Sequence, residues 1–339
     1  MFKPFTIGIL GLSLTPEERD FIAAERPWGF VLFARNIDTP DQVRSLTAEL
    51  REASGRDDVA VLIDQEGGRV QRLRPPHWAR YVAGAALGEV HARDPKKGER
   101  AAWLQGRLHA LDLAALGINV DCLPVLDVPV PGGHDAIGDR ALGTDPTVVT
   151  ALGRASIDGL LAGGVVPVMK HIPGHGRSTL DSHHDLPTVD EPLETLRKTD
   201  FAPFAALQDT PMAMTAHIVF PAIDPDHPAT TSAKLIKTII RGELGFDGLL
   251  LSDDVGMKAL KGDHAERARA IIAAGCDIVL ECNGTMDQRR AVASVLEEAS
   301  DVCIARAAKA MAHVGKSVAC DEQTCRDELA DLLGQTAIA

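Results

Sequence analysis

The sequence lacks the cysteine patterns that indicate a zinc site or a disulfide framework. Its six cysteines have neither metal-site spacing nor the clustering of a small secreted scaffold; they are Cys122, Cys276, Cys282, Cys303, Cys320 and Cys325. We therefore expect free thiols. Free thiols are typical of a reducing compartment, so the cysteine content predicts a cytoplasmic protein.

An excess of positive charge and long hydrophobic runs are also missing. The chain has 35 Lys and Arg against 48 Asp and Glu, a formal net charge of −13. Nucleic acids and anionic membranes need a basic surface, so neither is expected as a partner. No stretch approaches the roughly 18 unbroken apolar residues of a membrane-spanning helix. The apolar run at 5–14 is too short for a signal peptide and predicts a first strand instead.

Eight short apolar runs recur along the chain. Most are continuously hydrophobic rather than alternating, as expected of parallel strands that are covered on both faces. The runs are TIGILG (6–11), GFVLF (29–33), VAVLID (59–64), INVDCLP (118–124), VPVMKH (166–171), MAMTAH (212–217), GLLLSD (248–253) and DIVLEC (277–282).

The stretches between these runs carry helix-start signals. Capping boxes are predicted at Thr15, Thr39 and Thr285, and Asp94 and Asp145 each precede a proline. Eight strands that alternate with helices predict a single-domain α/β protein with the (β/α)₈ barrel fold over residues 1–339. We expect residues 286–339 to form a helical extension packed on the barrel. A doubly wound open sheet is the alternative, although no G-x-G-x-x-G follows the first strands, which argues against dinucleotide binding.

Polar residues end four of the eight runs. In a (β/α)₈ barrel the carboxyl ends of the strands surround the active site, so these side chains are expected at one rim. They are Asp64, Lys170 with His171, His217, and Asp253 with Asp254, and the loop after the fourth run adds Asp127 and Arg140.

The stretch DQEGGRVQR (64–72) shows this pattern most clearly. An aspartate such as Asp64 can accept two hydroxyl protons from a sugar, and a planar guanidinium suits a carbonyl or carboxylate. An Asp–Arg pair that only fixes the turn is the structural alternative.

The loop at 172–187 is long for a strand-to-helix connection and is rich in histidine. Asp181 and His183 lie two residues apart, so in an extended stretch the carboxylate can orient the imidazole as a general acid/base. A metal site is the alternative, with ligands drawn from His171, His175, His183, His184 and Asp185. The zinc pattern H-E-x-x-H is absent.

Asp253 follows an apolar strand, where a carboxylate is placed to attack an anomeric carbon. Asp254 is expected to point elsewhere and to bond the backbone of its own loop.

Seven stretches together resemble the bacterial β-N-acetylglucosaminidases of glycoside hydrolase family 3, the single-domain cytoplasmic enzymes of peptidoglycan recycling. They occur in the family's order: DQEGGRVQR (64–72), AIGDRALG (136–143), KHIPGHG (170–176), DSH (181–183), AHIVFPAIDP (216–225), ELGFDGLLLSDDVGM (243–257) and AGCDIVLECN (274–283).

The resemblance implies a role for each matching residue. Asp253 is the expected nucleophile, and His183 is the expected general acid/base, supported by Asp181 on a mobile catalytic flap. The residues expected to hold the terminal N-acetylglucosamine are Asp64, Arg72, Arg140, Lys170 and His171. No metal or cofactor is implied.

The implied reaction is retaining removal of a terminal β-linked N-acetylglucosamine from muropeptides, in particular those with an anhydro-muramyl end. The implied partner is this small-molecule substrate alone, and the protein is expected to be monomeric. Three alternatives stay open: a metal-dependent hydrolase that uses the loop histidines, a sugar sensor without turnover, and a hydrolase of a different hexoside. Water is the expected acceptor, with phosphate as its alternative.

Overall fold

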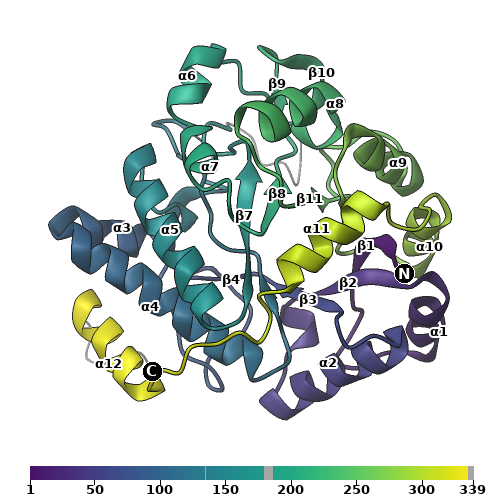
Figure 1. The fold of residues 1–339 in the computed structure, drawn as a ribbon, viewed down its shortest axis with the longest axis horizontal. Helices are drawn as coiled ribbons and strands as arrows, with labels where there is room; N and C mark the ends of the chain where they lie inside the picture. The colour runs from purple at the N-terminus through teal and green to yellow at the C-terminus, as the bar shows by residue number, and fades with distance from the viewer. Residues whose placement is uncertain (134, 179–185, 335–339) are drawn as a thin grey trace.

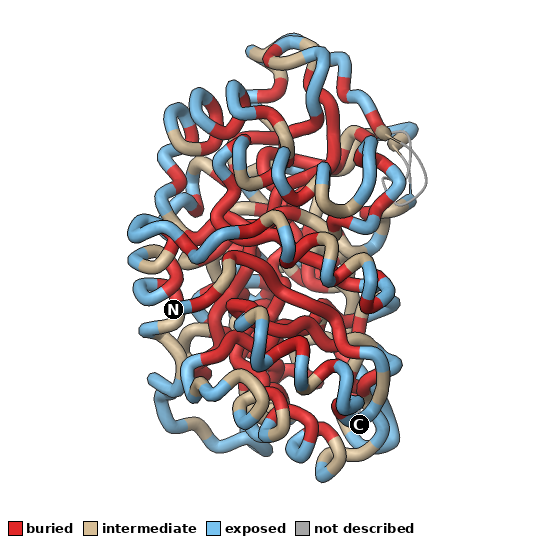
Figure 2. Tube along the Cα trace, turned by 90° about the vertical axis from the view of Figure 1, so that its right-hand side faces the viewer, coloured by how far each residue is buried: buried red, intermediate tan, exposed pale blue. Residues whose placement is uncertain are grey.

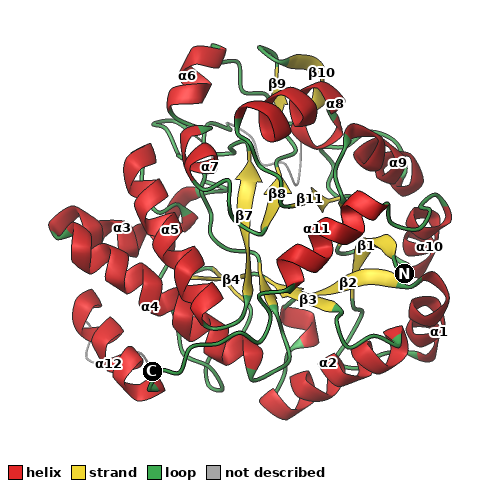
Figure 3. Cartoon of the chain, viewed as in Figure 1, coloured by secondary structure: helices red, strands yellow, loops and turns green. Residues whose placement is uncertain are grey.

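The computed structural model describes residues 1–133, 135–178 and 186–334. Eight parallel strands close into a barrel in the order β1-β12-β11-β8-β7-β6-β3-β2, with helices packed around it (Figures 1 and 3). The predicted (β/α)₈ barrel is confirmed, and the open sheet is excluded. The barrel strands are β1 (Lys3–Gly8), β2 (Pro27–Leu32), β3 (Ala60–Ile63), β6 (Val120–Asp121), β7 (Val166–Ile172), β8 (Met212–Thr215), β11 (Leu249–Asp254) and β12 (Ile278–Glu281).

Two short antiparallel ribbons, β4 (Gln65–Gly67) with β5 (Val70–Gln71) and β9 (Val219–Phe220) with β10 (Asp224–Pro228), follow β3 and β8. The helices are α1 (Pro16–Glu25), α2 (Pro40–Ser54), α3 (Gly84–Arg93), α4 (Pro95–Ala114), α5 (Pro146–Ala162), α6 (Leu193–Lys198), α7 (Ala202–Ala206), α8 (Ala233–Leu235), α9 (His264–Ala274), α10 (Met286–Ser294), α11 (Asp301–Met311) and α12 (Glu322–Leu333). Short helical segments are η1 (Ala34–Asn36), η2 (Gly138–Arg140), η3 (Ala229–Thr231) and the π-helical η4 (Ile236–Glu243).

The predicted helix starts depend on local hydrogen bonds. Thr15 and Thr285 form complete capping boxes, and Asp94 and Asp145 cap α4 and α5 ahead of a proline. The complete box predicted at Thr39 is wrong. Thr39 accepts the Gln42 backbone N–H, but the Gln42 side chain accepts from the Asp38 backbone and donates to Leu12 and Asn36. These contacts hold the glutamine away from the Thr39 backbone.

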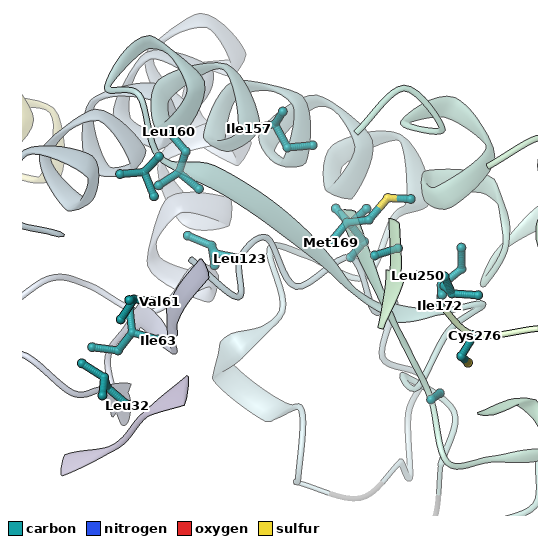
Figure 4. Packing of buried hydrophobic residues seen from close by; sticks show 14 of the residues in the cluster. Leu32, Val61, Ile63, Leu123, Ile157, Leu160, Met169, Ile172, Leu250 and Cys276 are labelled. Carbon is teal, nitrogen blue, oxygen red and sulfur yellow. The ribbon is translucent and has the colours of Figure 1, made fainter. Parts of the chain in front are cut away.

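The continuously apolar strands separate two hydrophobic clusters. On β3, Ala60 and Leu62 pack into the barrel interior, whereas Val61 and Ile63 pack outward beneath the helices. Figure 4 shows Val61 and Ile63 among the labelled residues of the outer cluster, together with Leu160 of α5. The buried segments concentrate along the middle of the molecule (Figure 2). Alternate side chains therefore enter different clusters, which explains why the strands need apolar residues on both faces.

Helix α11 closes the amino-terminal end of the barrel. Cys303, Ala307 and Ala310 of this helix belong to the inner cluster. Arg306 bonds Asp247 at 2.6 Å and Asp277 at 3.1 Å, and these aspartates precede β11 and β12. The carboxyl ends of the strands are consequently the end at which a ligand can enter.

The remaining carboxyl-terminal helices pack on the outside of the barrel. Helix α10 lies beside α9, and α12 lies against α3 and α4 (Figure 1). Arg326 of α12 donates to Asp112 of α4 at 2.9 Å. Over the described ranges, no helix combines the length and apolar character needed to cross a bilayer.

Candidate active site

A cavity of about 200 Å³ lies at the carboxyl ends of the strands. It gathers six of the eight residues predicted for the site: Asp64, Arg72, Arg140, Lys170, His171 and Asp253. These residues come from β7, β11, the loops after β3 and β6, and the turn after β5. The other two predicted residues, Asp181 and His183, lie outside the described residues, as do His184 and Asp185.

Asp64 pairs with two cations at once. Its Oδ1 accepts from Lys170 Nζ at 2.9 Å, and its Oδ2 accepts from Arg72 Nη2 at 2.8 Å. Burial alone would raise the pKa of Asp64, but the charges and hydrogen bonds of Lys170 and Arg72 hold that pKa well below its usual range. Asp64 is therefore ionised at neutral pH and can accept hydrogen bonds from two ligand hydroxyls.

Glu66 was not among the predicted site residues, yet it contacts two of them. Arg140 donates to its two oxygens at 2.8 Å each, and Lys170 Nζ lies 2.7 Å from Oε1. Against the effect of burial, Lys170 and Arg140 lower the pKa of Glu66. The spacing could have predicted Glu66 as a site residue. It lies two residues after Asp64, and side chains two residues apart in an extended chain lie on the same side.

Asp127 orients His171 and the start of the following loop. Its Oδ2 lies 2.7 Å from His171 Nδ1, and its Oδ1 accepts the backbone N–H groups of His171 at 3.2 Å and His175 at 2.7 Å. Burial would raise the pKa of Asp127, but the charge and hydrogen bond of His171 bring it to about 2. The sequence placed Asp127 near the rim, but its partner is 44 residues away in the chain.

The two aspartates at the end of β11 have different environments. Asp254 accepts the backbone N–H groups of Gly256 at 3.0 Å and Cys282 at 3.1 Å, and the amide of Asn283 at 3.3 Å. The prediction that Asp254 bonds loop backbone is confirmed. Both aspartates line the cavity, and Asp253 Oδ1 accepts the Asp254 N–H at 2.7 Å.

His217 does not line the cavity but contacts the end of β11, which carries Asp253 and Asp254. The side chain is fully buried, with Nδ1 2.7 Å from Thr230 Oγ1 and Nε2 3.0 Å from the carbonyl oxygen of Asp254. Burial lowers the pKa of His217, so the ring is neutral at pH 7. The prediction that this strand end projects into the rim is therefore wrong for His217, because its ring is engaged in holding β11.

Apart from Glu66, Asp254 and Asn283, the rest of the cavity wall is apolar or weakly polar. Its members are Val31, Phe33, Val70, Cys122, Met214, Leu280 and Cys282. The guanidinium of Arg72 lies 5.6 Å from the centre of the Phe33 ring, within range of a cation–π contact. Burial raises the pKa of the Cys122 and Cys282 thiols far above the usual value, which leaves them protonated and poorly nucleophilic.

Metal ligation was the main alternative for the histidine-rich loop. Within residues 1–133, 135–178 and 186–334, no three His, Cys, Asp or Glu side chains are grouped to hold a metal ion. His183, His184 and Asp185 belong to the remainder of the chain.

The chemistry of the cavity suits a polyhydroxylated ring. Asp64, Lys170 and His171 offer acceptors and donors for hydroxyl groups on one side, and Asp253 brings a carboxylate to the same space. The apolar wall accommodates the C–H face of a sugar.

Comparisons with known proteins agree with this chemistry. The model of the glycosyl hydrolase family 3 N terminal domain matches residues 8–316. The β-hexosaminidase of Bordetella avium (strain 197N) is 38% identical over 284 residues, which are 83% of this chain and 80% of that protein. The β-hexosaminidase of Alkalilimnicola ehrlichii is 40% identical over 287 residues, 84% of this chain and 81% of that protein.

A solved relative extends the match over almost the whole length. NagZ from Neisseria gonorrhoeae is 32% identical, with 98% of each chain covered. Its complex with N-trifluoroacetyl-D-glucosamine superposes with a TM-score of 0.86, and its complex with zinc ion with a TM-score of 0.85. The chain therefore belongs to glycoside hydrolase family 3, as a β-N-acetylhexosaminidase built on a single (β/α)₈ barrel.

Proposed function

We propose that the chain removes terminal, non-reducing β-linked N-acetylglucosamine with retention of configuration, through a covalent glycosyl-enzyme on Asp253. The observation that carries this proposal is the placement of Asp253 in one small cavity with the ion pairs of Asp64, Lys170 and Arg72. A cavity of about 200 Å³ suits one sugar unit, which favours cleavage from a chain end.

In the first step a carboxylate oxygen of Asp253 forms a bond to the anomeric carbon while the bond to the leaving oxygen breaks. His183 gives its proton to that oxygen, and Asp181 stabilises the imidazolium before transfer. In the second step His183 takes a proton from water, whose oxygen displaces Asp253 and releases the sugar. Each step inverts the anomeric carbon, so the two together retain its configuration. The spacing of Asp181 and His183 and the family resemblance support these roles.

The N-acetyl preference is supported by the relatives. The Bordetella and Alkalilimnicola proteins are named β-hexosaminidases, and the Neisseria protein was solved with an N-acylated glucosamine. We propose muropeptides with an anhydro-muramyl end as the substrate, on the resemblance to the peptidoglycan-recycling enzymes.

We further propose that the enzyme works in the cytoplasm as a single-domain monomer. The cysteines are all free, and five of the six are buried, which suits a reducing compartment. The packing of α10, α11 and α12 on the barrel supports one domain.

Nitrophenyl N-acetyl-β-glucosaminide and the matching β-glucoside test the reaction, each with EDTA present. Turnover of the N-acetyl sugar alone is expected, and NMR should detect the β-anomer as the first product. Cleavage of the glucoside alone would overturn the substrate class. Activity lost with EDTA and restored by zinc would favour a metal-dependent hydrolase, and binding without turnover would favour a sensor. Release of N-acetylglucosamine from its disaccharide with anhydro-N-acetylmuramic acid tests the natural substrate.

A further inference from the structure

We propose that Glu66 is a positioning residue. By holding Lys170 and Arg140, it sets the geometry and the charge of the side of the cavity that binds the sugar. This inference rests on the proposed function, since it assigns a role in binding the same sugar. Glu66 would act through its two cationic partners and not through a contact of its own with the substrate.

The exposure of the two carboxylates separates their roles. The Glu66 side chain is 4% exposed and that of Asp64 is 19% exposed. Both Glu66 oxygens accept from Arg140, and one of them also faces Lys170 Nζ at 2.7 Å. Asp64 therefore retains access to a ligand, whereas the oxygens of Glu66 are occupied by the protein.

Glu66 determines how Lys170 can meet a ligand. The side chain of Lys170 is 2% exposed, and an ammonium group has three N–H donors. Asp64 accepts one of them at 2.9 Å, and Glu66 Oε1 forms an ion pair with Nζ at 2.7 Å. Two carboxylates thus restrict the orientation of the ammonium group and the direction in which it can donate to a sugar hydroxyl. Without Glu66 the ammonium group would have Asp64 as its single carboxylate partner and could rotate.

Glu66 also joins three segments that are distant in sequence. It lies on β4, Lys170 lies on β7, and Arg140 ends η2 in the loop after β6. Arg140 donates in addition to the carbonyl oxygen of Ala136 at 3.1 Å, so its position fixes part of that loop. A substitution of Glu66 would therefore disturb the cavity at both Lys170 and Arg140.

Glu66 contributes to the charge balance of the cavity. The lining includes three cations, Arg72, Lys170 and Arg140, and four carboxylates, Asp64, Glu66, Asp253 and Asp254, which leaves −1 apart from His171. Replacing Glu66 by glutamine would raise this to 0. It would also turn an amide N–H group toward donors that need an acceptor. Losing this negative charge would favour the ionised form of Asp253 in the same cavity and lower its pKa.

The experiment compares E66Q and E66D with the wild type and with E18Q. Glu18 is a matched control, because it is also a buried glutamate that accepts from an arginine, Arg289, and from the backbone of Leu10 and Thr15. It does not line the cavity. We would measure kcat and KM for nitrophenyl N-acetyl-β-glucosaminide, the inhibition constant of free N-acetylglucosamine, the pH profile of kcat/KM and the melting temperature.

E66Q should raise both KM and the inhibition constant about 10- to 100-fold, the range for a lost charged hydrogen bond. The acid limb of its kcat/KM profile should move to lower pH. E66D keeps the charge on a shorter side chain, so it should recover the acid limb and part of the affinity. E18Q should melt earlier and retain the wild-type constants.

Wild-type KM and inhibition constant in a folded E66Q would overturn the role of Glu66. So would equal losses in E66Q and E18Q at similar melting temperatures. If E66Q does not fold, a folded E66D with unchanged KM and inhibition constant would overturn it. A wild type that does not cleave the N-acetylglucosaminide would instead overturn the proposed function, which the same assay reports separately.

Discussion

His171 donates a hydrogen bond from Nδ1 to Asp127, whose Oδ2 lies 2.7 Å away in a buried pair. Asp127 is the acceptor because the charge and hydrogen bond of His171 overcome burial and bring its pKa to about 2. This hydrogen bond fixes the ring orientation and leaves Nε2 as the nitrogen that can meet a ligand. The same carboxylate holds the backbone of His175, so one residue orients both the ring and the loop that follows β7.

We predict that D127N lowers kcat/KM about 10- to 100-fold, the range for loss of a charged hydrogen bond in a substrate-binding site. Asparagine keeps one of the two acceptor oxygens and replaces the other by an NH2 group, which would face a donor of His171 or His175. The measurement is hydrolysis of the nitrophenyl N-acetylglucosaminide, corrected for folded protein by circular dichroism.

D277N is the matched control for that variant. Asp277 is also buried and accepts from Arg241, Arg306 and the Leu250 backbone, but it lies at the amino-terminal end of the barrel. We expect D277N to lose stability and to keep its kcat/KM. Equal kcat/KM losses in the two variants would contradict a specific role for Asp127.

We also predict that the protein loses stability as the pH falls from about 6.5 to 4. Burial and the charge of His171 lower the pKa of His175 to about 4, whereas an unfolded histidine titrates near 6.5. Between these values the unfolded chain binds more protons, so the free energy of unfolding decreases on acidification. For His175 alone the decrease is on the order of 3 kcal/mol. Urea unfolding at pH 7, 5.5 and 4 measures it.

The pH range distinguishes the contribution of His175 to stability from that of the paired carboxylates. The pKa values of Asp64, Glu66 and Asp127 are lowered, so their contribution to stability is lost only as the pH falls below about 4. H175Q should weaken the pH dependence above pH 4 without abolishing it, because burial also lowers the pKa of His217. H227Q, at an exposed site, should leave it unchanged. A full wild-type slope in H175Q would show that another group is responsible.

The barrel was predictable because its signals are local. Each strand needs apolar residues toward the interior and toward the helices, and most helix starts, although not those of α3, α6 and α7, are marked by a capping side chain. Strand length was less predictable. The run at 118–124 predicts a longer strand than β6, Val120–Asp121. Pro124 has no N–H to donate to a neighbouring strand, which contributes to ending the regular pairing.

From the pattern of apolar runs in the sequence, only those site residues were predictable that directly follow a predicted strand. Asp64, Lys170 and Asp253 follow apolar runs, and the barrel rule brings them together. The role of His217 was misjudged because its partners, Thr230 and the Asp254 carbonyl, come from other segments. The pairs of Glu66 with Arg140 and of Asp127 with His171 likewise form only when the barrel closes.

The two aspartates that end β11 should respond differently to the same substitution. D253N should reduce kcat by about 1,000-fold or more, because an amide cannot form the glycosyl-enzyme. D254N should mainly lower the melting temperature, since Asp254 accepts the backbone N–H groups of Gly256 and Cys282. Mass spectrometry with a slow fluorinated substrate should find the adduct on Asp253. An adduct on Asp254, or an active D253N, would reverse the assignment.

A substitution at His183 tests the proposed general acid/base. The sequence suggests this role, and His183 lies outside the described residues. Dinitrophenolate leaves without a proton, whereas a sugar alkoxide must be protonated as its bond breaks. H183A should therefore lose at least 100-fold in kcat/KM on a disaccharide, within the usual range for general acid catalysis, and much less on the dinitrophenyl substrate. D181N should show a weaker form of the same pattern. H184A is the control for disturbing the loop, and its losses should not depend on the leaving group. If H183A loses equal activity on both substrates, and EDTA abolishes wild-type turnover, the loop histidines bind a metal and His183 does not transfer the proton.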